Sequence, residues 1–102
     1  MAFQQWLSID VKERIKTGAP IQIVDVREPY EFENGHIPGA KLIPLGQLQT
    51  RVSEIVKSAE TVVVCHSGGR SSVACDFLDQ LGYQNIRNLM GGMSAWDGQV
   101  EY

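Results

Sequence analysis

The chain has 102 residues, of which 43% are hydrophobic and 21% charged, a composition ordinary for one globular domain. Its net charge of −3 argues against nucleic acid or an anionic membrane as the main partner, so any anion must be bound by a local site. The absence of a membrane-length apolar run or a visible signal peptide, together with only two cysteines, indicates a protein of the reducing cytoplasm rather than a disulfide scaffold.

Helix and strand signals alternate along the first half of the chain. Asp10 followed by Glu13 has the spacing of a capping box and predicts a helix that ends before Gly18 and Pro20. Residues 21–26 are mostly apolar and β-branched, which predicts a strand covered on both faces. After it we expect a short acidic helix, a loop, a brief strand and a longer helix, over residues 27–32, 36–40, 41–43 and 48–56.

The second half continues this alternation and holds the most apolar strand. Residues 61–65 predict that strand, and apolar residues then recur at three- and four-residue spacing over 71–82, which predicts a helix. A last strand is expected over residues 85–89, followed by a short helix around Trp96. The alternation predicts an α/β fold in which a small, mostly parallel sheet carries helices on both faces, within a single domain spanning residues 1–102.

The strand over residues 61–65 delivers a cysteine into a short turn that contains two glycines. Ligands of parallel sheets bind beyond the carboxyl ends of the strands, where Cys65 is expected to lie. Backbone N–H groups in the turn, the start of the following helix and a guanidinium would all favour a thiolate over a thiol. The sequence therefore predicts Cys65 as a nucleophile for an anionic or electrophilic substrate, with a substrate-binding loop made of His66, Ser67, Gly68, Gly69, Arg70 and Ser71.

Each of these residues also has a purely structural interpretation. Cys65 could be a small buried hydrophobe and Arg70 a surface charge, although their spacing favours an active loop. Ser67 and Ser71 are more often turn and helix-cap residues than catalysts. The sequence leaves two interpretations of His66 open, since it could place partial positive charge near an anionic donor or simply be an exposed loop residue.

The other polar and thiol-bearing residues suggest structural roles. Cys75 lies within the predicted helix, where it cannot readily face Cys65 for a disulfide, so we expect it in the core. The cysteines and histidines lack the spacing of metal ligands, and we expect no metal and no organic cofactor. Asp25 and Arg27 are expected to form a charged pair that braces the neighbouring loops, and both tryptophans to pack against apolar residues.

Three stretches resemble the signatures of the rhodanese-like sulfurtransferase family and occur in the same order. They cover residues 25–40, the loop CHSGGRS at 65–71 and residues 91–96. The resemblance extends from about Val11 to Trp96, and the residues that follow lack the family's Gly-x-Pro ending. It implies the rhodanese-like fold and the transfer of a sulfane sulfur from a donor such as thiosulfate, through a cysteine persulfide, to a thiophilic acceptor.

Loop length distinguishes two chemistries among relatives of this family. Four residues between cysteine and arginine accompany sulfur transfer, whereas five accompany phosphate or arsenate chemistry, because a wider ring of N–H groups can hold a tetrahedral oxyanion. Four residues separate Cys65 from Arg70, so the resemblance implies a small anionic sulfur donor and an acceptor that is cyanide, a thiol or a protein. A non-enzymatic persulfide carrier or interaction module in a sulfur relay and, less favoured, a phosphatase-like enzyme remain alternatives.

Overall fold

The computed structural model describes residues 3–102 and contains a sheet in which every paired strand runs parallel to its neighbour. The spatial order of its strands is β1-β5-β4-β2-β3. These are β1 (Gln4–Trp6), β2 (Gln22–Asp25), β3 (Lys41–Leu42), β4 (Thr61–Val64) and β5 (Ile86–Leu89). The helices are α1 (Ser8–Lys16), α2 (Pro29–Glu33), α3 (Leu48–Arg51) and α4 (Gly69–Gln80), with 3₁₀ turns η1 (Leu45–Gln47), η2 (Val52–Glu54) and η3 (Gly92–Ala95). None of the helices in this described part is long and apolar enough to cross a membrane.

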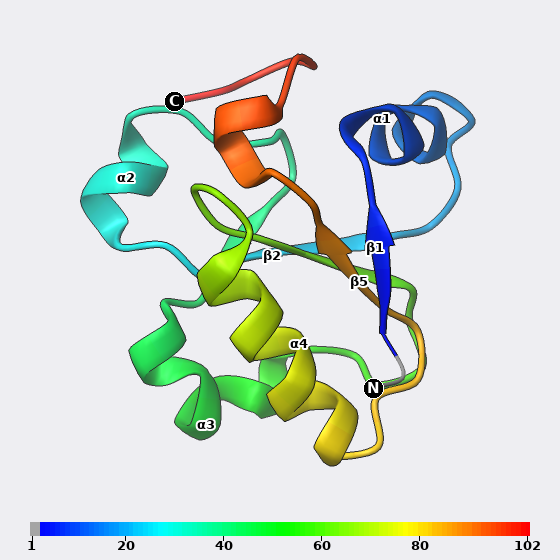
Figure 1. Ribbon diagram of the computed structural model, residues 1–102, viewed down its shortest axis with the longest axis vertical. Coiled ribbons are helices and arrows are strands. Elements are labelled where there is room, and N and C mark those ends of the chain that lie inside the picture. Colours follow the sequence, from blue (N-terminus) through cyan, green and yellow to red (C-terminus); the bar gives the residue numbers. More distant parts are fainter. Residues whose placement is uncertain (1–2) are drawn as a thin grey trace.

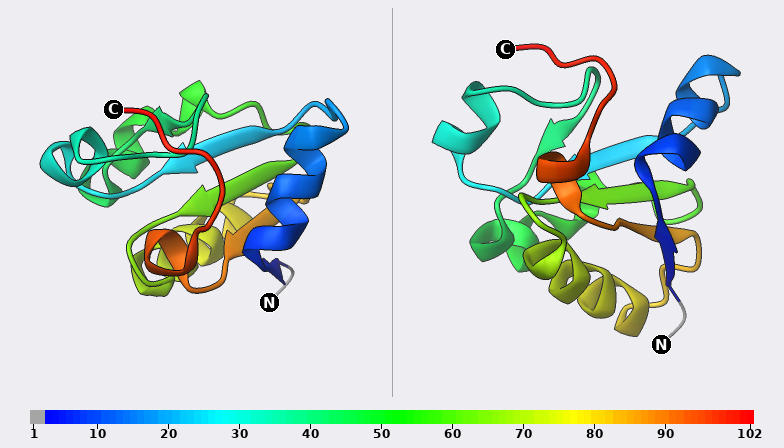
Figure 2. Two further views of the ribbon diagram at one scale, coloured as in Figure 1. Left: turned by 90° about the horizontal axis from the view of Figure 1, so that it is seen from above. Right: turned by 45° about the horizontal axis from the view of Figure 1, so that its top comes forward.

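Helices cover both faces of the sheet, which confirms the predicted architecture (Figure 1). Helices α3 and α4 lie on one face, and α1 and η3 lie on the other, as the two further views show (Figure 2). Because successive strand residues point to opposite faces, Val63 and Cys65 join the cluster on the α4 side, whereas Val62 and Val64 join the cluster on the α1 side. Both sides of β4 are therefore apolar, and the strand has a continuous apolar sequence.

Strand β1 is absent from the sequence-based expectations. Its three residues include two glutamines and no β-branched residue, so local propensity does not indicate a strand. Pairing with β5 forms it instead, with Gln5 opposite Asn88 in the parallel register. This N-terminal segment places a polar side chain beside β5, close to the loop that follows β4.

The expected start of the first helix is wrong by three residues. Helix α1 begins at Ser8, and Asp10 is its third residue rather than its cap. The Asp10 carboxylate accepts a hydrogen bond from the backbone N–H of Leu7 at 2.7 Å, which satisfies a donor that the helix itself cannot pair. The Asp10 and Glu13 pattern correctly indicates a nearby helix start, but Leu7 is the cap and Asp10 is the helical residue whose side chain binds it.

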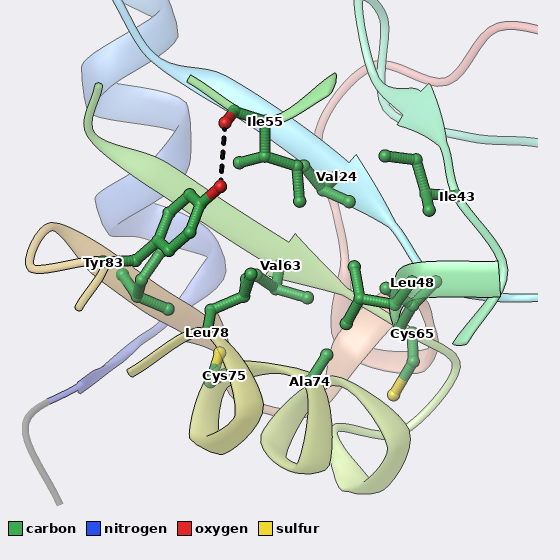
Figure 3. Close-up of a cluster of buried hydrophobic side chains, with 12 residues drawn as sticks. Val24, Ile43, Leu48, Ile55, Val63, Cys65, Ala74, Cys75, Leu78 and Tyr83 are labelled. Atoms are coloured by element: carbon green, nitrogen blue, oxygen red, sulfur yellow. Dashed lines mark hydrogen bonds between the residues drawn. The ribbon is translucent and has the colours of Figure 1, made fainter. Parts of the chain in front are cut away.

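The helix expected over residues 48–56 is also wrong as a continuous α-helix. Only α3 is α-helical there, and the turn η2 follows it directly. The hydroxyl of Tyr83 shares its hydrogen between the backbone carbonyls of Val52 and Ile55, at 3.0 and 3.1 Å. Figure 3 shows the contact with Ile55. A side chain from beyond α4 thus binds carbonyl groups that a longer helix would pair with its own backbone, and no local sequence pattern shows this.

Candidate active site

Cys65 is the first residue after β4 and lies at the carboxyl end of the sheet, where the sequence places it. Its sulfur lies beside the first turn of α4 (Figure 3). The residue is only 1% exposed. An outside molecule can therefore reach the sulfur only with a small terminal group.

The loop after Cys65 directs hydrogen-bond donors at its sulfur. Gly68 has a positive φ of 106°, which L side chains rarely adopt, and its N–H donates to Sγ of Cys65 at 3.0 Å. Burial by itself raises the pKa of Cys65, but the Ser71 hydroxyl and the backbone N–H groups of Ser71, Gly68 and Ser67 together lower it below its usual value. The loop therefore favours a thiolate, the nucleophilic form of cysteine.

Helix α4 begins at Gly69, two residues before the expected start, because the left-handed Gly68 ends the loop directly before it. Arg70 consequently lies in the first helical turn instead of closing the loop ahead of it, and Ser71, which is expected from the sequence to open the helix, is the third helical residue. Ser71 is fully buried beside Cys65, with its Oγ 3.3 Å from Sγ. This turn brings a side-chain hydroxyl and the positive end of the helix dipole to the sulfur.

The turn η3 supports the loop from the opposite side. Its backbone N–H groups at Met93 and Ser94 donate to the carbonyls of Cys65 and His66, each at 2.9 Å. These two bonds fix the peptide groups that follow Cys65 and His66, and the second of these carries the sulfur-facing N–H of Ser67. Residues 91–96 resemble a family signature in the sequence, and in the structure their backbone also holds the active loop in place.

Arg70 forms an ion pair that the sequence analysis missed. Its guanidinium donates two hydrogen bonds to the carboxylate of Glu31 in α2, at 2.8 and 2.9 Å. The hydrogen bonds from Arg70 lower the pKa of Glu31 to about 2, and Glu31 raises the pKa of Arg70. Charge interaction with Cys65 also raises the pKa of Arg70, to a smaller extent. Arg70 therefore joins the loop to α2 while its charge still acts on the sulfur.

The remaining loop side chains face outward. His66, Ser67 and Gly69 are exposed, so only the backbone N–H of Ser67 takes part in the sulfur-facing set. The position of His66 is compatible with both interpretations that the sequence left open. The structure thus brings Cys65, Gly68 and Ser71 together and leaves the other side chains at the rim.

Cys75 is buried in α4, within the same apolar cluster as Cys65. Burial and the nearby charge of Cys65 raise the pKa of Cys75 to about 12, so it stays a thiol at neutral pH. Both cysteines are free, and residues 3–102 contain no group of three metal-ligating side chains.

Asp25 and Arg27 form a buried ion pair at 2.8 Å, and Arg27 also donates to the carbonyl of Gly35, which braces the segment after α2.

Replacing Cys75 with serine is expected to reduce stability without removing activity. A hydroxyl without an assured partner in an apolar cluster costs roughly 1–3 kcal/mol of unfolding free energy. Urea unfolding measures that loss, and Cys75→Ala serves as the matched control because it removes the thiol without burying a hydroxyl. A stable Cys75→Ser protein that lacks the sulfur transfer implied by the family resemblance would show that Cys75 resolves an intermediate.

Comparison with known proteins matches residues 8–99 to the rhodanese-like domain. A protein of Allochromatium vinosum named sulfurtransferase is 39% identical over 89 residues, which cover 87% of this chain and 83% of the relative. The Bacillus subtilis protein YrkF, provisionally named a sulfur carrier, is 37% identical over 90 residues that cover 88% of this chain and 49% of YrkF, so the chain spans about half of that relative. The crystal structure of a rhodanese-like domain protein from Staphylococcus aureus matches with a TM-score of 0.90 and 33% identity, over 97% of both chains. The expected rhodanese-like fold is confirmed.

Proposed function

This chain belongs to the rhodanese-like family of sulfurtransferases and sulfur carriers, and we propose that it transfers sulfur as an enzyme, through a persulfide on Cys65. The observation that carries the proposal is the set of donors around Sγ of Cys65, above all the Gly68 N–H at 3.0 Å. Donors fixed in this way stabilise negative charge on sulfur before any substrate arrives. We place the protein in the cytoplasm, where free thiols persist.

The proposed reaction has two displacement steps. The Cys65 thiolate attacks the outer sulfur of thiosulfate, a new S–S bond forms, and the old S–S bond breaks as sulfite leaves with its electron pair. A nucleophilic acceptor then attacks the terminal sulfur of the persulfide, and the Cys65 thiolate leaves. The loop amides hold negative charge in the resting thiolate and in the persulfide. Neither step requires a metal or an organic cofactor.

The burial of Cys65 restricts the substrates that can take part. Because the residue is 1% exposed, the donor must present an unsubstituted terminal sulfur, as thiosulfate and small persulfides do. The same restriction applies to the acceptor, which we propose to be cyanide, a small thiol or a protein thiol on an extended segment. The burial of Cys65 therefore selects substrates by the size of the group that reaches its sulfur.

The test of this proposal is thiocyanate formation from thiosulfate and cyanide, run beside hydrolysis of a chromogenic phosphate ester. We expect turnover in the first assay and none in the second. Hydrolysis of the ester without thiocyanate formation would overturn the proposal in favour of a phosphatase.

A persulfide carrier is the second candidate, and the Arg70–Glu31 ion pair favours it. An arginine already paired to a carboxylate attracts a dianionic donor less strongly than an unpaired one. A carrier would accept one sulfur from thiosulfate in a single round but turn over slowly with cyanide. Comparing the single-round rate with steady-state turnover distinguishes a carrier from an enzyme.

Replacing Arg70 with alanine is expected to raise the pKa of Cys65, because a nearby positive charge that favours the thiolate is lost. A higher pKa leaves less Cys65 thiolate at neutral pH. Alkylation by a neutral reagent therefore slows at neutral pH, and its pH profile moves to higher pH. Glu31→Gln is the matched control, since it removes the opposing carboxylate and leaves Arg70 in place. That variant should not move the profile to higher pH. An Arg70→Ala profile identical to the native one would mean that the amides and the hydroxyl hold the thiolate alone.

A further inference from the structure

A chain of polar side chains runs from Cys65 to the edge strand β1. The Ser71 hydroxyl contacts Sγ of Cys65 and donates a short hydrogen bond to Oδ1 of Asn88 in β5. The Asn88 Nδ2 group donates to Oε1 of Gln5 at 2.8 Å and lies 3.4 Å from the carbonyl of Gly68. Ser71 is fully buried and Asn88 is 3% exposed, whereas Gln5 is exposed. The chain therefore connects the nucleophile to solvent through two buried polar residues.

The hydrogen available at Ser71 determines which protonation state of Cys65 this arrangement suits. The Ser71 hydroxyl has one hydrogen, and donation to Asn88 leaves none for the sulfur. The contact between Sγ and the Ser71 Oγ can then be a hydrogen bond only if the Cys65 thiol is the donor. In this arrangement the Asn88 amide directs Nδ2 toward Gln5 and the Gly68 carbonyl and Oδ1 toward Ser71, which suits the neutral thiol.

Ionisation of Cys65 reverses the requirement, because a thiolate can only accept. The Ser71 hydrogen must turn toward the sulfur, which leaves its oxygen facing Oδ1 of Asn88 at close range with no hydrogen between them. Half a turn of the Asn88 side-chain amide removes this repulsion, since Nδ2 then donates to the Ser71 Oγ. Gln5 is exposed and can turn its own amide to donate to Oδ1. The turn gives up the long contact from Nδ2 to the Gly68 carbonyl and leaves Oδ1 facing that carbonyl oxygen, a weak repulsion that the new bond from Nδ2 to the Ser71 Oγ must outweigh.

We propose that Asn88 is a positioning residue whose side-chain amide reverses its orientation when Cys65 ionises, which makes Ser71 a hydrogen-bond donor to the thiolate. The inference rests on the proposed function only in taking Cys65 as the nucleophile. The proton of Cys65 leaves to solvent, and the Ser71 hydrogen changes direction without being transferred. Asn88 thus controls the nucleophile without touching it.

Other ionisable groups act on Cys65 and must be separated from Asn88. Arg70 in α4 interacts with Cys65 by charge, and Cys75 in the same helix is a thiol whose pKa the charge of Cys65 raises. His66 follows Cys65 in the loop, and Glu31 reaches Arg70 from α2. All four remain in place when Ser71 or Asn88 is replaced. Comparisons among variants of Ser71 and Asn88 therefore isolate the hydrogen-bonded chain.

The direct test is a pH titration of the full chain by NMR, without any sulfur donor. The Cβ signal of Cys65 reports its ionisation, and nuclear Overhauser contacts of the Asn88 Nδ2 protons report which neighbour they face. We expect contacts with Gln5 below the midpoint and with the Ser71 side chain above it, at the same midpoint as Cys65. In Ser71→Ala, Cys65 should still titrate while the Asn88 amide keeps one orientation. An Asn88 amide that keeps its orientation while native Cys65 ionises would overturn the proposal.

A second variant tests the same chain by reactivity. Asn88→Asp retains an acceptor for the Ser71 hydrogen but cannot become a donor, so alkylation of Cys65 by a neutral reagent should slow roughly tenfold below the midpoint. Charge repulsion between Asp and the thiolate also slows it, but that repulsion persists in a Ser71→Ala background. We therefore expect a clearly smaller slowing by Asn88→Asp in that background, and equal slowing in both would contradict the proposal. Because no sulfur donor is present, these results stand or fail independently of sulfur transfer.

Discussion

Replacing Cys65 with alanine is expected to abolish sulfur transfer and leave the fold intact. Cys65 is the one thiol among residues 3–102 whose sulfur receives the loop amides, and Cys75 has a pKa of about 12 and is fully buried. No other described sulfur can therefore replace it. The substitution removes a single sulfur atom from the edge of the core, which costs about 1 kcal/mol of unfolding free energy. Thiocyanate formation and urea unfolding measure the two effects separately.

Cys65→Ser is the matched control for this experiment. Serine keeps the size of the side chain and can accept the hydrogen bond from Gly68, but its hydroxyl is not ionised at neutral pH and is a weak nucleophile for sulfur. Both variants should be folded and inactive. Turnover by folded Cys65→Ala would place the chemistry at another group and refute the persulfide mechanism.

Replacing Gly92 with alanine is expected to disrupt the active loop from outside it. A Cβ at this position would lie 2.5 Å from the carbonyl oxygen of His66 and closer still to that of Cys65, and both atoms belong to backbone that cannot move aside without shifting the loop. We expect a loss of roughly 1–3 kcal/mol from overpacking, with about 1–2 kcal/mol more because Gly92 has a φ of 56°. Displacement of the sulfur-facing amides should lower sulfur transfer roughly a hundredfold.

Gly18→Ala is the matched control, because it introduces the backbone strain of a positive φ without a steric clash of the added Cβ. Gly18 also has a positive φ, of 72°, but an added Cβ there meets nothing within 4 Å. The control should lose stability by strain alone and keep its full transfer rate. Stability is measured by urea unfolding and activity by thiocyanate formation. A folded Gly92→Ala protein with the native rate would show that η3 does not set the loop geometry.

The sequence predicts the elements whose residues carry their own signal. Residues 62–64 are three valines in succession, and a strand buried on both faces needs no further information to be recognised. Cys65 follows directly, so its place at the carboxyl end of the sheet is predictable from the same pattern. The glycines at 68 and 69 likewise indicate a tight turn before a helix.

Most of the features that the sequence does not predict depend on distant partners, whereas the starts of α1 and α4 differ from expectation through local contacts at Leu7 and Gly68. Strand β1 forms because β5 offers an unpaired edge, and the long helix ends early because Tyr83 binds its carbonyls. Nothing in the sequence around Glu31 and Asn88 indicates that they contact Arg70 and Ser71, which the fold places beside them. Local composition cannot reveal such pairings, because they join residues far apart in the chain.

The persulfide on Cys65 is tested most directly by intact mass spectrometry after incubation with thiosulfate and removal of excess donor. We predict that the native chain gains the mass of one sulfur atom, that cyanide removes it, and that Cys65→Ala gains nothing. Peptide mapping should place the added sulfur on Cys65. An unchanged native mass, or the added sulfur on Cys75, would contradict the account.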